Sequence, residues 1–336
     1  LVILSNVTAS PTNQIPGNPG KFFVLGTSSQ FDRVHMSPDG TYWMLGAMME
    51  DGSDDKAIIM TGSDMTTATF MTHFVEDAPA FFDSNQSYNT FSSVAAINNN
   101  GEFAFSCDLN ATSVDEVVIR GSRLGLPTLI AREGSAIPFL SGRNYGGVLD
   151  AVGILEYGTA YFRIETPSGT PTHDFLVTCD GTTGNALVET AVTKPTDQFF
   201  SPTNLMEHLR AERFRMDSSG TTFLYEGDLA GSTGLDTVFV KNNSVLAQEA
   251  ALVPGSSLIT GLSSFSGDNG SLQLSPNGQH YAYRGTVIAT AQDFVLSTVG
   301  VFETGQPLVP GSSETWSDAT GITNTFLGNA VNDWGD

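Results

Sequence analysis

Apolar and polar residues alternate along most of this chain in short runs, and the runs recur with a nearly fixed period. A tight turn centred on a glycine marks each recurrence, at Gly40, Gly101, Gly158, Gly220, Gly278 and Gly335. Successive glycines stand 61, 57, 62, 58 and 57 residues apart. Polar residues precede each glycine, which predicts a repeated hairpin whose glycine takes a positive φ.

Each repeat is predicted to contain four strands, named A to D in chain order. Strand A is the apolar stretch before the turn, and strand B is the alternating stretch after it, as in residues 41–45. Strand C is an apolar, largely β-branched run, and strand D follows it, as in residues 128–130. An aspartate opens strand C in five repeats: Asp55, Asp115, Asp174, Asp236 and Asp293. We expect these side chains to accept backbone N–H bonds from the preceding turn and to fix the hairpin register.

Four short strands in about six repeats predict an all-β chain, folded as a single β-propeller domain over residues 1–336. A β-sandwich is the alternative, but it gives no reason for a fixed period. Only residues 204–213, with Leu205, Met206 and Leu209, have the spacing of a short helix. The connections from strand D to the next strand A, such as residues 76–90, are expected to be long and to crowd one face with the B–C loops.

Two of the turns carry a family resemblance. The SPDG at residues 37–40 and the SPNG at residues 275–278, each followed by an aspartate and an apolar strand, resemble the WD40-like repeats of TolB-type β-propellers. The copies INNNGEFAF and LEYGTAYFR are similar to an N-x-x-G-x-x-x-x-R theme of bacterial extracellular tandem-repeat proteins, with Arg163 at the position of the arginine. The resemblance implies the propeller fold and is nearly silent about function.

The two ends of the sequence are predicted to share the last blade. Leu1, Val2, Ile3 and Leu4 match a strand C, and residues 329–336, which include Val331 and Trp334, match a strand A and its turn. That blade lacks its strand B and would expose two unpaired edges. We expect either a neighbouring subunit or a further stretch of the native chain to fill the gap. A truncated record of a longer array is the other explanation.

Charge narrows the range of partners. The chain has 14 Lys and Arg against 36 Asp and Glu, a net charge of -22. Such a surface repels phosphate backbones and anionic lipid, so neither nucleic acid nor membrane insertion is expected, whereas cations and basic protein patches suit it. The same acidity also serves solubility. A low charged fraction with abundant Ser, Thr, Asn and Gly is typical of a secreted or cell-surface protein.

Residues suited to chemistry are sparse. Glu50, Asp51, Asp54 and Asp55 form the densest carboxylate cluster, which would suit Ca²⁺, although a solvated acidic turn is the favoured explanation. Trp316, in a long D–A loop, is the aromatic residue best placed for a ligand. The sequence has no catalytic motif, so we expect no catalytic residue and no cofactor other than Ca²⁺. Cys107 and Cys179 are too few for a disulfide scaffold, and they either pair or remain as buried thiols.

Three classes of function follow from these features. The favoured one is a non-catalytic extracellular structural module, such as a subunit of a surface filament or array, that self-associates through its incomplete blade. The second is a secreted module that binds a protein, a glycan or calcium on its long-loop face. The third is an enzyme of the glycosidase or lyase type.

Overall fold

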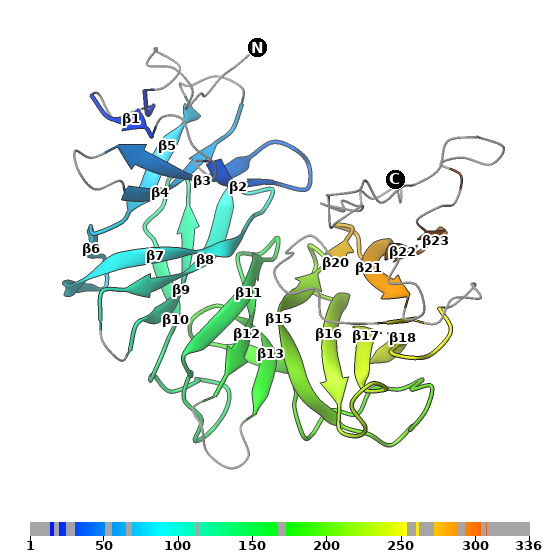
Figure 1. Cartoon of the computed structure of the whole chain (residues 1–336). Helices are drawn as coiled ribbons and strands as arrows, with labels where there is room; N and C mark the ends of the chain where they lie inside the picture. Colours follow the sequence, from blue (N-terminus) through cyan, green and yellow to red (C-terminus); the bar gives the residue numbers. More distant parts are fainter. Residues whose placement is uncertain are drawn as a thin grey trace. The chain divides into compact units, whose positions relative to one another are not determined.

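The computed structural model describes residues 14–16, 20–24, 31–50, 56–64, 69–111, 114–166, 173–253, 260–261, 272–287, 293–303 and 307 (Figure 1). The chain divides into two compact units, residues 1–172 with 176–187 and residues 173–175 with 188–336. All regular elements of the described residues are β-strands, as predicted. No helix in the described part of the chain is long and apolar enough to cross a membrane.

The first unit contains two complete sheets that share a core. The first sheet comprises β1 (Phe22–Phe23), β2 (Phe31–Met36), β3 (Trp43–Glu50), β4 (Lys56–Gly62) and β5 (Met71–Val75). The second comprises β6 (Pro79–Ala80), β7 (Asp83–Ile97), β8 (Glu102–Leu109), β9 (Glu116–Ser122) and β10 (Thr128–Arg132). Phe74 of the first sheet packs against Phe105 of the second, with ring centroids 4.9 Å apart. An aromatic core therefore holds these two sheets together.

The remaining sheets repeat the same strand order. The third consists of β11 (Val148–Ile154), β12 (Ala160–Glu165), β13 (Asp174–Cys179) and β14 (Gly184–Glu189). In the second unit, the fourth sheet consists of β15 (Met206–Met216), β16 (Phe223–Leu229), β17 (Thr237–Lys241) and β18 (Ser244–Gln248). The fifth consists of β19 (Thr260–Gly261), β20 (Leu272–Leu274), β21 (Tyr281–Val287), β22 (Asp293–Ser297) and β23 (Gly300–Glu303).

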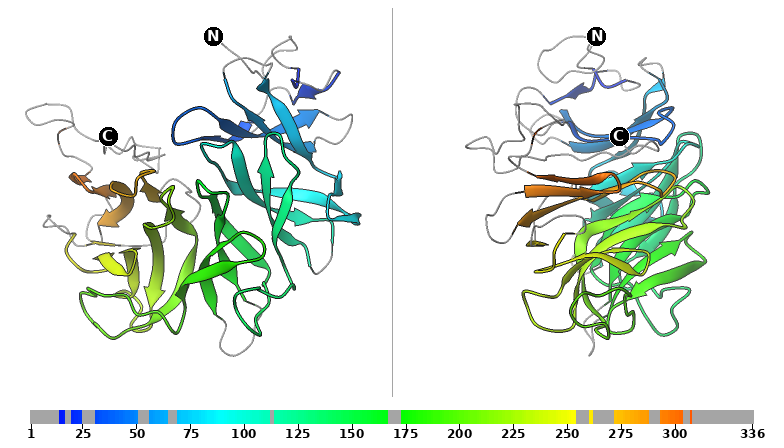
Figure 2. Two further views of the ribbon diagram at one scale, coloured as in Figure 1. Left: turned by 180° about the vertical axis from the view of Figure 1, so that it is seen from behind. Right: turned by 90° about the vertical axis from the view of Figure 1, so that its right-hand side faces the viewer.

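Each of the five sheets contains a meander of four antiparallel strands in chain order, which is the structure of a propeller blade. The fourth and fifth sheets lie side by side in the second unit (Figure 2). They share a core in which the Phe239 and Tyr283 rings stack with centroids 4.4 Å apart. The all-β, blade-like organisation expected from the sequence is thus confirmed. The number of blades and the closure of a ring through the chain ends remain predictions.

Five of the six turn glycines lie in the described residues, and all five occupy the same hairpin. Each glycine N–H donates to the carbonyl oxygen three residues earlier at 2.8 to 3.1 Å, and each glycine φ lies between 72° and 77°. A side chain would strain this backbone, which explains why glycine recurs here. The five are Gly40, Gly101, Gly158, Gly220 and Gly278.

Within each unit, successive turns are also joined to one another. The Asp39 N–H donates to Asn99 Oδ1 at 2.9 Å, and Asn98 Nδ2 donates to the Leu155 carbonyl at 2.9 Å. In the second unit the Ser218 N–H donates to the Pro276 carbonyl at 2.8 Å. These bonds satisfy turn groups that would otherwise lack partners and fix the spacing of neighbouring sheets.

Two expectations about local structure are wrong. Residues 204–213 are not helical, because β15 begins at Met206 and runs to Met216. Its ladder with β16 shifts register between Leu209 and Phe214, and such a bulge breaks the strict alternation of a strand. The D–A connection at residues 76–90 is also shorter than expected, since β7 already begins at Asp83.

Glycines late in strand C leave room for aromatic rings early in strand B. A Cβ at Gly121 would lie 2.2 Å from the Phe103 ring, and one at Gly62 would lie 2.0 Å from the Trp43 ring. We expect Gly121→Ala to lower the free energy of unfolding by about 1–3 kcal/mol, as overpacking does in a buried core. Urea unfolding would measure it against Gly147→Ala, whose Cβ meets only the flexible Glu133 carboxylate at 3.3 Å. Equal losses in the two variants would contradict this explanation.

Candidate functional site

The matching hairpins place one position of strand B in the same register in every sheet. It is occupied by Gly46, Ser106, Arg163, Glu226 and Arg284. The four of these residues that have a side chain are buried, with exposed fractions of 0% for Ser106, 7% for Arg163, 5% for Glu226 and 1% for Arg284. Charged side chains are rarely buried without partners or a function, so this position directs the search for a site.

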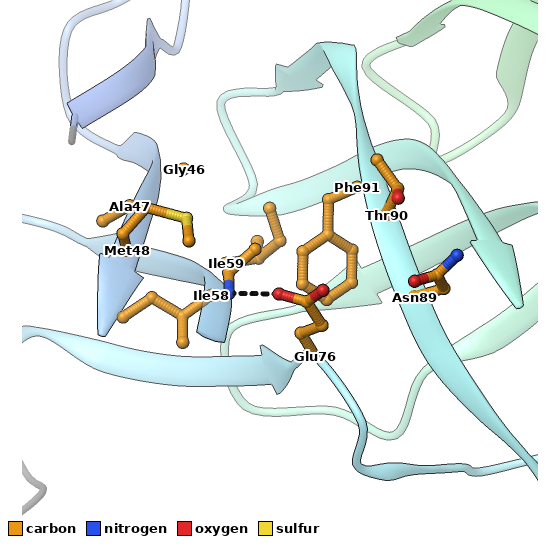
Figure 3. Close-up of a pocket in the computed structure, with 10 residues that line it drawn as sticks. Gly46, Ala47, Met48, Ile58, Ile59, Glu76, Asn89, Thr90 and Phe91 are labelled. Carbon is orange, nitrogen blue, oxygen red and sulfur yellow. Dashed lines mark hydrogen bonds between the residues drawn. The ribbon is translucent and has the colours of Figure 1, made fainter. Parts of the chain in front are cut away.

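The glycine of this set borders a cavity in the first unit. The cavity has a volume of about 270 Å³ and lies between β3 and β4 of the first sheet and β7 of the second (Figure 3). Its lining includes Gly46, Met48, Ala57, Glu76, Asn89, Thr90 and Phe91. Asn89 and Thr90 are exposed, and the ladder between β7 and β8 shifts register between Tyr88 and Phe91.

Glu76 supplies the only charge among the residues that line this cavity. It follows the last residue of β5, and its Oε2 accepts the Ala57 N–H at 2.7 Å while its own N–H donates to the Ala57 carbonyl at 2.8 Å. Figure 3 shows the second carboxylate oxygen directed toward β7, beside the Phe91 ring. Among the described residues, no hydrogen bond to that second oxygen is found. The cavity therefore presents a positioned anionic oxygen to whatever enters it.

The bond to Ala57 is one case of a recurring contact, here called the strand-D clamp. In it, a side-chain oxygen at the end of strand D accepts a backbone N–H at the start of strand C. Glu133 Oε2 accepts the Asp115 N–H at 3.0 Å, and Thr190 Oγ1 accepts the Asp174 N–H at 2.9 Å. Glu249 likewise accepts the Thr237 N–H. This clamp was not predicted from the sequence, although the periodic recurrence of these residues could have revealed it.

The structure gives the strand-C aspartates several roles. Asp236 Oδ1 accepts the Gly234 N–H at 3.2 Å, which is the type of bond we expected of all five residues. Asp115 and Asp174 bond the strand-D clamp through their backbone N–H groups. Asp293 begins β22, but its side chain lies outside the described residues, as does all of Asp55.

In the second sheet, the positions equivalent to the cavity lining are carboxylates. Asp108 of β8 lies opposite Glu116 of β9, whereas the equivalent pair in the first sheet is Met48 and Ala57. Burial raises the pKa of Glu116 to about 7; the Leu149 N–H opposes this, while Asp108, Asp150 and Glu133 add to it. This cluster can hold a proton near neutral pH.

Beside this cluster, Arg163 neutralises Asp150. Its Nε and Nη2 contact the two Asp150 carboxylate oxygens at 2.8 Å and 2.6 Å. The two residues are direct neighbours in the ladder between β11 and β12. The arginine of the sequence theme therefore serves a bidentate ion pair, which is the strongest form of this contact.

In the second unit, the shared strand-B position is occupied by Glu226, which belongs to a buried ionic network. Burial raises the pKa of Glu226, and the Arg213 and Arg210 guanidinium groups oppose that rise. The Tyr283 hydroxyl donates to Glu226 at 3.3 Å. Asp228 accepts from Arg210 Nη2 and from the Thr237 hydroxyl, both at 2.9 Å. These side chains are therefore hydrogen-bond or ionic partners of one another, although Arg210 Nε has no hydrogen-bond partner among the described residues.

Most of the site residues predicted from the sequence lie outside the part of the chain that the structure describes. These are Asp51, Asp54, Asp55, Trp316, Leu1, Val2, Ile3, Leu4, Val331 and Trp334. Glu50 ends β3, but its side chain is not described. The described residues contain no group of three or more His, Cys, Asp or Glu side chains placed to hold a metal ion. Calcium binding at residues 50–55 and self-association through the chain ends therefore remain predictions.

The two cysteines are free and buried, which decides between the alternatives left open by the sequence. Burial raises the pKa of the Cys107 thiol, and the Asp108 and Glu116 carboxylates raise it further. Burial also raises the pKa of Cys179. Protonated, inaccessible thiols are poor nucleophiles, so they contribute to packing.

Comparison with known proteins yields structural similarities only. No protein-family profile and no curated protein matches the sequence. TolB from Acinetobacter baumannii is 12% identical with a TM-score of 0.42, over 82% of this chain and 54% of that one. An oligogalacturonate lyase in complex with manganese is 8% identical with a TM-score of 0.43, over 79% of this chain and 63% of that one.

Hydrazine synthase from Kuenenia stuttgartiensis is 8% identical with a TM-score of 0.36, over 82% of this chain and 80% of that one. The chain thus spans about half the length of TolB and under two thirds of the lyase. At these identities and scores, the fold class of the chain rests on its own repeated turns and sheets.

Proposed function

We propose that the chain is a secreted, non-catalytic binding module, built as a single β-propeller of about six blades, whose ligand enters the cavity beside Glu76. The second sheet fills the equivalent positions with Ser106, Asp108 and Glu116, and the fourth fills them with Glu226, Asp228 and Thr237. The first sheet has Gly46, Met48 and Ala57 there. The first sheet thus keeps the strand order of the other sheets but has smaller or apolar side chains at these positions, where the cavity lies. This observation supports the proposal, because ligand sites are concave, largely preformed and lined by few polar groups.

The exposed residue Thr90 offers a way to close the cavity without altering the buried core. We expect at least one of three probes, methyl glucoside, calcium chloride or N-acetyl-lysine methylamide, to raise the melting temperature of the wild-type chain by about 2–4 °C at saturating concentration. Thr90→Trp should abolish that rise, since its indole would obstruct the mouth.

Differential scanning fluorimetry measures both chains side by side, and the unliganded melting temperatures show whether the variant is folded. Thr203→Trp, at an exposed position of the second unit, is the matched control and should respond like the wild type. The proposal fails if no probe stabilises the wild type, or if Thr90→Trp responds equally.

A further inference from the structure

Resting on the proposed binding function, we infer that the cavity receives one basic side chain, a lysine or an arginine, from an extended segment of a partner protein. The first reason is the unmatched charge of Glu76. Its Oε2 accepts a neutral backbone N–H, and none of the side chains that the structure describes forms an ion pair with Glu76; Lys56, next to Ala57 in the sequence, forms one with Asp77 instead. A charge-assisted bond to a cation would satisfy the remaining oxygen better than water or a neutral donor does.

The other lining residues suit a basic side chain. The Phe91 ring lies beside the carboxylate in Figure 3, and Phe105 packs edge-on against it with ring centroids 5.8 Å apart. Phe91 can therefore offer cation–π contact on the side toward the cavity. Met48 provides apolar surface for the methylene stem of a lysine or arginine, whose charged head reaches the carboxylate.

Buried carboxylates in other sheets show that a guanidinium group is a suitable partner for a carboxylate in this part of a sheet. In the third sheet, Arg163 supplies the cation to Asp150, and in the fourth, Arg210 supplies it to Asp228. Asp150 and Asp228 are thus each met by a guanidinium group of the chain itself. In the first sheet, glycine stands at the position of Arg163, and its ladder neighbour Arg33 has a side chain that lies outside the described residues.

The charge of the whole chain favours the same class of partner. A net charge of -22 creates a field that draws basic segments to the surface and repels acidic ones. Asn89 and Thr90, on the exposed stretch of β7 at the cavity, can hydrogen-bond the backbone of an extended segment. A cavity of about 270 Å³ has room for one long side chain with a few waters, each taking roughly 30 Å³.

The test uses the full chain and compares N-acetyl-lysine methylamide and N-acetyl-arginine methylamide with the neutral N-acetyl-norleucine methylamide, by titration followed in NMR spectra. The cationic probes should bind at least ten times more tightly than the norleucine probe. Glu76→Gln should reduce their affinity at least tenfold, because glutamine keeps an acceptor for the Ala57 N–H and loses only the charge. Glu133→Gln is the matched control, since Glu133 holds the same clamp in the second sheet and does not line the cavity.

The outcomes separate this inference from the proposed function. Equal binding of the norleucine probe, or Glu76→Gln binding as tightly as wild type, overturns the basic side chain as ligand. If methyl glucoside or calcium binds instead, and Thr90→Trp abolishes that binding, the binding function stands without this inference. Saturable binding of the cationic probes that survives Thr90→Trp overturns both, because the ligand then lies elsewhere.

Discussion

Glu116→Gln is expected to stabilise the chain by about 3 kcal/mol at pH 8 and by almost nothing at pH 4. The folded state raises the pKa of Glu116 from 4.5 to about 7, and each pKa unit corresponds to about 1.4 kcal/mol. Below pH 4.5 the carboxyl is protonated in both the folded and the unfolded chain. As the pH rises toward 7 the unfolded chain releases its proton first, so the folded state loses stability across the window from pH 4.5 to 7.

Urea unfolding at several pH values measures the difference between the variant and the wild type. Glutamine can still accept the Leu149 N–H, so the substitution removes the charge and keeps the bond. His73 titrates in the opposite sense, since burial lowers its pKa to about 4 and its protonation destabilises the fold below pH 6.5. That contribution is common to both chains and cancels in the difference.

The exposed carboxylate of Glu207, on β15, provides a control, because Glu207→Gln should change stability little at any pH. A stabilisation by Glu116→Gln that is the same at pH 4 and pH 8 would show that neither burial nor the carboxylates around Glu116 impose a cost when it ionises.

The strands and turns could be predicted from the sequence because their causes are local. The residues at 37–40 and at 275–278 have the hairpin chemistry of a polar residue followed by a glycine at positive φ, and the structure shows that hairpin. Alternation then assigns the strands that follow. It fails at β15, where the bulge before Phe214 disturbs the alternation and imitates a helical spacing.

The candidate site could not be predicted, because it arises from how neighbouring strands align. Arg163 and Arg284 are equivalent only once the hairpin before β21 is seen to be one residue longer than the hairpin before β12. Gly46 is one of 35 glycines, and nothing in the sequence separates it from those that serve turns. A cavity created by a missing side chain leaves no motif.

Arg213→Met is expected to produce the largest loss of stability, about 3–5 kcal/mol at pH 7, because it leaves the buried carboxylate of Glu226 without its main counter-charge. Arg215→Met, on the same strand, is the control and should cost less than about 1 kcal/mol, since Arg215 is only partly buried. The loss in Arg213→Met should be smaller at pH 5 than at pH 7, because burial raises the pKa of Glu226 and a protonated Glu226 needs no counter-charge. Urea unfolding at the two pH values measures both effects.

A double-mutant cycle decides whether the charges act as a pair. Glu226→Met alone leaves Arg213 buried without Glu226, so it should also destabilise the chain. The double variant should be more stable than either single variant, because two apolar side chains can fill the space of a buried ion pair at little cost. Additive losses would mean that Arg213 and Glu226 stabilise the chain independently. A non-additive result would mean that Arg213 and Glu226 neutralise each other within the second unit. Glu76, beside the cavity, has no such ion pair among the described residues.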